Sequence, residues 1–172
     1  TLRAVPGRME TLQMGQTFTV LIDYAHTPGA FSRLLPAIRR LTPGRCITVF
    51  GSAGERDTRK RRLQGEIADT NSDIIVLTDE DPREEDSMAI IREIADACSS
   101  HTENKDLFLI PDRKTAIQTA LGIAAEGDTV LLLGKGHEGS IQYATGSRPW
   151  DEAETARSLL KDIMKTTEEN SE

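Results

Sequence analysis

The chain has 172 residues, enough for one domain, and its 37% hydrophobic but only 4% aromatic residues predict a core of Leu, Ile, Val and Ala. The net charge of −7 argues against a protein that wraps nucleic acid, and no apolar run approaches the roughly 20 residues of a bilayer span. With two cysteines and no secretion signal pattern, the sequence predicts neither a disulfide framework nor export, and we expect a cytoplasmic protein.

Apolar runs of strand length alternate with segments of helical periodicity along nearly the whole chain. The predicted strands are residues 17–22, 46–50, 74–78, 107–110 and 129–133. The predicted helices between them are residues 28–41, 58–69, 87–99 and 114–125, the last with Asp112 as its N-cap. Ile141 and Tyr143 then alternate with polar residues, as in an edge strand, and residues 151–165 form a final helix.

Strands that are almost continuously apolar are buried on both faces, and with helices between them they predict right-handed crossovers. The fold class is therefore α/β, an open and mostly parallel sheet with helices on both faces and one antiparallel edge strand. Residues 1–172 form a single domain, in which residues 1–8 are a linker and residues 166–172 a disordered tail. Because the chain starts with Thr1 and such a linker, we expect it to be part of a longer protein.

In an open parallel sheet, ligands bind beyond the carboxyl ends of the strands. The predicted strands are followed there by loops rich in glycine, charge and histidine, at residues 23–28, 51–57, 79–83, 111–113 and 134–139. Loops at this edge are polar in most α/β proteins, so their composition alone does not identify a site.

Three charged side chains at this edge fit a small zwitterion. Arg56 can bind a carboxylate or a phosphate with two nitrogens of its guanidinium. Asp81 and Arg83 flank Pro82, whose fixed backbone angle would hold an anionic and a cationic group at a defined separation. A ligand with both an ammonium and a carboxylate matches that pair.

Other motifs are weaker. Residues 134–139 match the dinucleotide fingerprint G-x-G-x-x-G, but a strand pattern follows where the fingerprint requires a helix. No P-loop is present, the basic run 56–62 lacks the aromatics of a nucleic-acid platform, and no carboxylate spacing indicates a metal site. His26 and His137 lack a Ser or Cys nucleophile in matching context, so a hydrolase is not indicated.

Five motifs, in order, resemble the C-terminal domain of the Mur ligases. They are GRME at residues 7–10, DYAHTP at 23–28, GSAGERD at 51–57, DEDPR at 79–83 and GKGHE at 134–138. The resemblance covers about residues 7–160 and is greatest to the members that add 2,6-diaminopimelate. It implies a Rossmann-like fold.

The resemblance also implies an ATP-dependent amide ligase of peptidoglycan synthesis. In the family, ATP phosphorylates the terminal carboxylate of UDP-MurNAc-L-Ala-D-Glu, and the amine of a diamino acid attacks the acyl phosphate. Mg²⁺ assists through ligands expected in a central domain, which this sequence does not include and over which the C-terminal domain closes. We therefore expect no metal ligand and no catalytic residue here, and no turnover by the chain alone.

Carried over by position, the resemblance assigns roles to individual residues. The nucleotide edge would be formed by Arg8, Asp23, Tyr24 and His26, with the first two at the ribose. The pocket for the incoming amino acid would be formed by Arg56, Asp81, Arg83, Gly134 and Glu138. In diaminopimelate, Arg56 and Arg83 would bind the far carboxylate and Glu138 the far ammonium.

Two positions depart from the family pattern, Asp81 where diaminopimelate enzymes have Asn and Ala53 where Gly is usual. Lysine-adding members usually lack the arginine at position 83, so Arg83 favours diaminopimelate, whereas the charge of Asp81 leaves lysine or ornithine open. Two other hypotheses remain. One is a stand-alone nucleotide or amino-acid binding module of the same fold, and the other is a dinucleotide oxidoreductase that uses residues 134–139.

Overall fold

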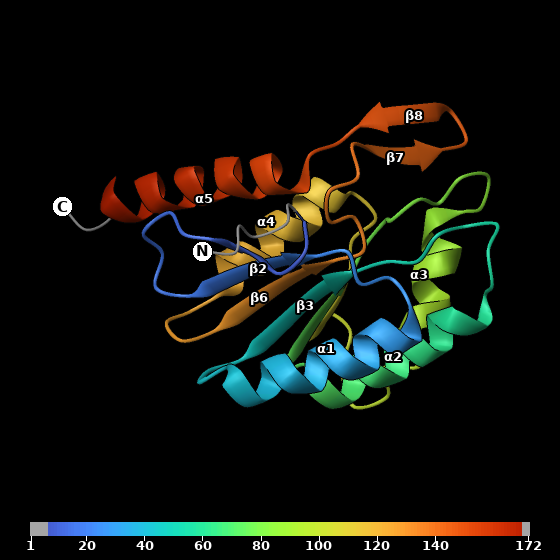
Figure 1. Ribbon diagram of the computed structural model, residues 1–172, viewed down its shortest axis with the longest axis horizontal. Helices are drawn as coiled ribbons and strands as arrows, with labels where there is room; N and C mark the ends of the chain where they lie inside the picture. Colours follow the sequence, from blue (N-terminus) through green and yellow to red (C-terminus); the bar gives the residue numbers. More distant parts are fainter. Residues whose placement is uncertain (1–6, 170–172) are drawn as a thin grey trace.

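A mostly parallel sheet forms the centre of the protein, which confirms the predicted fold class (Figure 1). The computed structural model describes residues 7–169. Its strands are β1 (Glu10–Leu12), β2 (Thr19–Asp23), β3 (Cys46–Phe50), β4 (Ile74–Leu77), β5 (Leu107–Leu109), β6 (Thr129–Leu133), β7 (Ser140–Tyr143) and β8 (Gly146–Pro149). The main sheet has the order β1-β2-β6-β3-β4-β5, in which β1 is antiparallel to β2 and the other neighbours are parallel.

Five helices cover the two faces of this sheet within residues 7–169, and none of them is long and apolar enough to cross a membrane (Figure 1). They are α1 (Pro28–Leu41), α2 (Arg59–Asn71), α3 (Ser87–Ala95), α4 (Arg113–Ile123) and α5 (Glu152–Glu169). The first three pack on one face around Phe31 and Phe50, whose rings meet edge to face at 5.0 Å. The last two pack on the other face, where Ile117 and Leu160 are fully buried. Burial of strands on both sides explains their continuous apolar runs.

Side chains cap the first turns of three helices that follow strands of the main sheet. The side chains of Thr27, Asp86 and Asp112 accept hydrogen bonds from the first-turn amides of α1, α3 and α4. The predicted cap at Asp112 is thereby confirmed, with a distance of 2.8 Å between its Oδ1 and the amide nitrogen of Thr115. These caps fix the residue at which each helix begins.

The antiparallel edge strand exists but is not the predicted one. It is β1, whose three residues are too short to show a period in the sequence. Ile141 and Tyr143 do form a strand, yet β7 pairs with β8 in a separate hairpin beyond the main sheet (Figure 1). Helix α5 continues through residues 166–169, where a disordered tail is expected, while residues 1–6 of the linker and 170–172 lie outside the described part.

Arg113 ties the carboxyl edge of the sheet to α5. Its side chain is fully buried and donates to the main-chain oxygens of Asp79 at 2.9 Å and Leu133 at 2.8 Å. It also donates to both carboxylate oxygens of Glu152, at 2.9 and 2.7 Å, and the indole of Trp150 donates to the same carboxylate at 2.6 Å. Although burial alone would lower it, the pKa of Arg113 lies above its ordinary value because of Glu152. The guanidinium of Arg113, which is shielded from solvent, thus joins the ends of β4 and β6 to the first turn of α5.

Replacing Glu152 by Gln is expected to lower the free energy of unfolding by about 3 kcal/mol, because it leaves a buried guanidinium without its counter-charge. Urea denaturation followed by circular dichroism measures this loss. The matched control is Glu66→Gln, which removes the partner of the exposed Arg62 and should have no measurable effect. A loss below about 1 kcal/mol for Glu152→Gln would show that the pair does not hold this edge.

Candidate functional site

The sheet brings the predicted site segments to one edge, and their main chains bind one another there. The amide of Gly54 donates to the carbonyl of Asp81 at 2.8 Å, and the amide of Gly134 donates to the carbonyl of Asp23 at 3.2 Å. The amide of Arg83 donates to the carbonyl of Gln142 at 2.9 Å. The loops after β2, β3, β4 and β6 and the strand β7 therefore form one connected surface.

A cavity of about 410 Å³ opens in this surface. Its walls are Asp81, Arg83, Lys135, Glu138, Gly139, Ser140 and Gln142. Three residues predicted to bind the incoming amino acid, Asp81, Arg83 and Glu138, thus share one cavity. Gly134 lies beside it, in the turn that carries Lys135 and Glu138.

Lys135 holds the two carboxylates of this cavity together. Its Nζ lies 2.9 Å from Oδ1 of Asp81 and 2.7 Å from Oε2 of Glu138. The same Oδ1 of Asp81 accepts from the amide of Gln142 at 2.8 Å. Sequence reasoning missed Lys135, although a lysine between two glycines at the end of a buried strand is a usable signal.

The glycines on either side of Lys135 have backbone conformations that other residues rarely adopt. Gly134 has φ +102° and Gly136 has φ +48°. A Cβ on Gly134 would lie 2.9 Å from Oε2 of Glu80, and one on Gly136 would lie 2.7 Å from the carbonyl oxygen of Gly7. Both positions therefore need glycine for space as well as for conformation.

Glu80 is a buried carboxyl group at this edge. Only 6% of the residue is exposed, and its Oε2 has no hydrogen-bond partner within residues 7–169. Burial raises the pKa of Glu80 above the ordinary value of 4.5, against the opposing effect of the nearby Lys60 and Arg113. Folding therefore shifts the proton equilibrium of this side chain toward the protonated form.

Arg83 lies in the wall of the cavity and has a strained backbone. Its φ of +56° is unusual for a residue with a side chain, and the hydrogen bond of its amide to Gln142 fixes that conformation. Its Nε is buried and has no partner in the described part of the chain. A buried guanidinium nitrogen without an acceptor favours an anionic ligand at this wall.

Arg56 is not brought to the cavity. It is exposed in the loop before α2 and is not among the residues that line the wall. Its loop does pack closely on the loop of Asp81, since a Cβ on Gly54 would lie 2.0 Å from the carbonyl oxygen of Pro82. The structure therefore groups Asp81, Arg83 and Glu138, and leaves the predicted role of Arg56 unsupported by a contact.

The predicted nucleotide residues gather next to the cavity. The ring centre of Tyr24 lies 4.6 Å from that of His26 and 5.2 Å from that of His137, and the guanidinium carbon of Arg8 lies 5.6 Å above it. The carboxylate of Asp23 accepts from the amides of Met9 and Ala25, so it also shapes the main chain there.

Tyr24 connects this edge to the cavity lined by Asp81, Arg83 and Glu138. Its hydroxyl donates to Oε1 of Glu138 at 3.1 Å. Burial and then the Glu138 carboxylate raise the pKa of Tyr24 above 10. The two groups of predicted binding residues are thus in direct contact.

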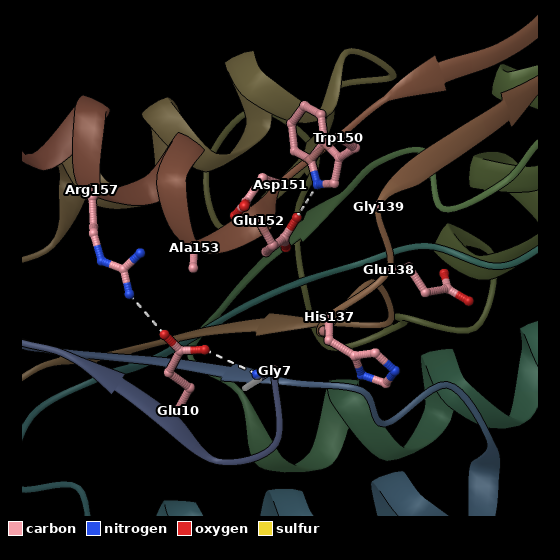
Figure 2. Close-up of a pocket in the computed structure, with 11 residues that line it drawn as sticks. Gly7, Glu10, His137, Glu138, Gly139, Trp150, Asp151, Glu152, Ala153 and Arg157 are labelled. Carbon is pink, nitrogen blue, oxygen red and sulfur yellow. Dashed lines mark hydrogen bonds and ion pairs between the residues drawn. The ribbon is translucent and has the colours of Figure 1, made fainter. Parts of the chain in front are cut away.

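A second cavity, of about 340 Å³, lies on the other side of the Glu138 loop (Figure 2). Figure 2 shows it between the segment of Gly7 and Glu10, the loop of His137 and Glu138, and the start of α5. Glu10 accepts from the amide of Gly7 at 2.9 Å and pairs with Arg157 at 2.8 Å. The charges of Glu10 and Arg157 therefore satisfy each other across this cavity.

The competing motifs find no support in the geometry. Residues 134–139 lead into strand β7 rather than a helix, so the dinucleotide fingerprint lacks its structural context. In the basic run, Arg59, Arg61 and Arg62 each pair with a carboxylate, and Arg61 is buried. Within residues 7–169, no group of three or more His, Cys, Asp or Glu side chains is placed to bind a metal ion.

The comparisons with known proteins all indicate the same family. The model of the Mur ligase glutamate ligase domain matches residues 7–136. The UDP-N-acetylmuramyl-tripeptide synthetase of Borreliella burgdorferi is 52% identical over 168 residues, 98% of this chain and 33% of that protein. The UDP-N-acetylmuramoyl-L-alanyl-D-glutamate–2,6-diaminopimelate ligase of Aquifex aeolicus is 42% identical over 156 residues, 91% of this chain and 32% of that protein.

A solved structure of a UDP-N-acetylmuramoyl-L-alanyl-D-glutamate–2,6-diaminopimelate ligase superposes with a TM-score of 0.79 at 29% identity. The superposition covers 94% of this chain and 32% of the chain in the solved structure. The chain thus spans about a third of the length of the relatives it matches.

Replacing Glu80 by Gln is expected to change how stability depends on pH. Because burial raises the pKa of Glu80 in the folded protein, the contribution of Glu80 to the free energy of unfolding falls as pH rises above about 4.5. Gln does not titrate, so the stability of the variant relative to the original protein should increase from pH 4.5 to pH 8. Urea denaturation at pH 4.5, 6 and 8 measures the trend.

The exposed neighbour Glu84 provides the control, since Glu84→Gln should leave the pH dependence unchanged. A difference between Glu80→Gln and the original protein that stays constant with pH would contradict a raised pKa for Glu80.

Proposed function

The chain belongs to the Mur ligase family, and we propose that it serves as the C-terminal domain of an enzyme that adds a diamino acid to UDP-MurNAc-L-Ala-D-Glu. The observation that supports this best is the cavity in which Asp81, Arg83 and Glu138 meet. It offers carboxylates for an ammonium group and a guanidinium for a carboxylate, the two kinds of charge that an amino acid carries.

In this proposal the chain binds and orients the incoming amine. ATP converts the terminal carboxylate of the UDP-muramoyl dipeptide to an acyl phosphate, and the α-amine of the diamino acid displaces phosphate to form the amide. Glu138 and Asp81 would hold the far ammonium, and Arg83 the far carboxylate, so that the α-amine points out of the cavity. Residues 7–169 offer no cluster for Mg²⁺, and we assign its ligands to a central domain.

The nucleotide would lie at the adjacent edge, against Arg8, Asp23, Tyr24 and His26. The contact between the Tyr24 ring and the Arg8 guanidinium supports this assignment, because together they form a flat, positively charged surface. The central domain of the same longer protein would close the site from the other side. A cytoplasmic location agrees with Cys46 and Cys98, which are both unpaired and buried.

Among the possible amines we propose meso-diaminopimelate, with lysine or ornithine as the alternative. The unpaired Nε of Arg83 favours a ligand with a second carboxylate. The extra charge of Asp81, the feature that would favour lysine or ornithine, is balanced by Lys135 at 2.9 Å. Comparing the activity of the intact enzyme with the three amino acids tests this choice.

A stand-alone binding module with the same fold is the second candidate, because every contact in the cavity comes from this chain. The two candidates differ in what the chain does alone. As a ligase domain, the isolated chain should release no phosphate from ATP with all substrates present, and it should bind nucleotide or amino acid weakly at most. A phosphate-release assay measures this, and robust turnover would contradict the domain assignment.

Replacing Arg83 by Ala in the intact enzyme should lower kcat/KM for diaminopimelate by roughly 10- to 100-fold, because a hydrogen bond between charged groups is lost. The value for lysine, which has no far carboxylate, should change far less. The control is Arg40→Ala, which removes an exposed guanidinium in the last turn of α1, away from the cavity wall. Equal losses for both amino acids would show that Arg83 does not read the far carboxylate.

A further inference from the structure

Lys135 is the buried cation of the amino-acid cavity. Its side chain is 1% exposed, whereas the side chains of Asp81 and Glu138 are 14% and 35% exposed. A ligand in the cavity therefore meets the two carboxylates first and the ammonium of Lys135 behind them. A lysine so deeply buried is stable only when its charge is paired, as it is here.

The main chain leaves Lys135 little freedom. The glycines on both sides cannot gain a side chain without overlapping Glu80 or Gly7, so the turn is fixed against its neighbours. The amide of Glu138 donates to the carbonyl of Lys135 at 2.8 Å and closes the turn. The position of Nζ between the two carboxylates thus follows from the backbone.

Both carboxylates depend on this one nitrogen. Two carboxylates within hydrogen-bond distance of the same point repel each other, and without a cation between them one would rotate away. Each has one other fixed contact, Asp81 with the amide of Gln142 and Glu138 with the hydroxyl of Tyr24. Neither of those neutral donors supplies the missing positive charge.

We propose that Lys135 is a positioning residue that holds the carboxylates of Asp81 and Glu138 side by side, and so makes the cavity select a side chain that ends in an ammonium group. The inference rests on the proposed function. With Lys135 in place, the pair of carboxylates has one excess negative charge, which the far ammonium of a diamino acid balances.

The test uses the intact enzyme and pairs of substrates that differ only in the far ammonium. These are diaminopimelate with 2-aminopimelate, lysine with norleucine, and ornithine with norvaline. In Lys135→Met, KM for the diamino acid should rise at least about 10-fold, while kcat and the KM of the neutral analogue change by less than about 3-fold. The control Lys105→Met removes an exposed lysine at the opposite edge and should change neither.

The second variant combines Lys135→Met with Asp81→Asn. Glu138 then carries the one excess negative charge, so the double variant should recover most of the lost preference for the diamino acid. Asp81→Asn alone, in which Lys135 neutralises Glu138, should show a weaker preference than the double variant. The comparison between Asp81→Asn and the double variant tests the role of Lys135 even if the single variant Lys135→Met does not fold.

Three results would overturn the inference. The first is an equal rise in KM for the diamino acid and its neutral analogue, which would mark Lys135 as structural only. The second is a further loss of at least about 10-fold when Lys135→Met is added to Asp81→Asn. The third is an original enzyme that forms no amide with any of the three diamino acids, which refutes the proposed function and the inference with it.

Discussion

One buried guanidinium holds the functional edge of this protein in place. Arg113 donates to the last carbonyl of β6, to the carbonyl of Asp79 just after β4 and to the carboxylate at the start of α5, so three segments far apart in the sequence share one charge. The loops of Asp81 and Lys135 begin within a few residues of those carbonyls. Because a buried charge must keep its partners, the edge cannot open locally without exposing or orphaning it.

The parallel strands of the sheet can be predicted from the sequence because the burial of each strand determines the residues within that strand. Strands buried on both faces must be apolar throughout, and the runs at residues 46–50 and 129–133 match β3 and β6 without error. The short antiparallel strand β1 and the hairpin of β7 and β8 follow from tertiary contacts instead. The three residues of β1 are too few to show an alternating pattern of polar and apolar side chains. Tyr143, in β7, pairs with the exposed strand β8 rather than with the main sheet.

The sequence predicted those site residues that directly follow parallel strands, because the carboxyl ends of parallel strands meet at one edge of the sheet. That rule, together with the family resemblance, places Asp81, Arg83 and Glu138 around one cavity. Lys135 was not predictable in this way because its importance lies in burial and pairing, which depend on how two loops meet. Arg56 shows the opposite case, since its charge and position are suggestive but its side chain is exposed in the folded chain. Composition indicates which groups are available, and only packing decides which of them face a ligand.

The close approach of Gly7 to residues 136 and 137 has a mechanical consequence. A Cβ on Gly7 would lie 2.2 Å from the amide nitrogen of His137, so the segment that enters the domain rests directly on the turn that presents Glu138. Any pull or rotation along the polypeptide at residue 7 must then displace this turn or be resisted by it. The main chain at Gly7 and the turn of Glu138 are thus mechanically coupled without an intermediate helix, so a displacement at residue 7 would reorient the Glu138 carboxylate.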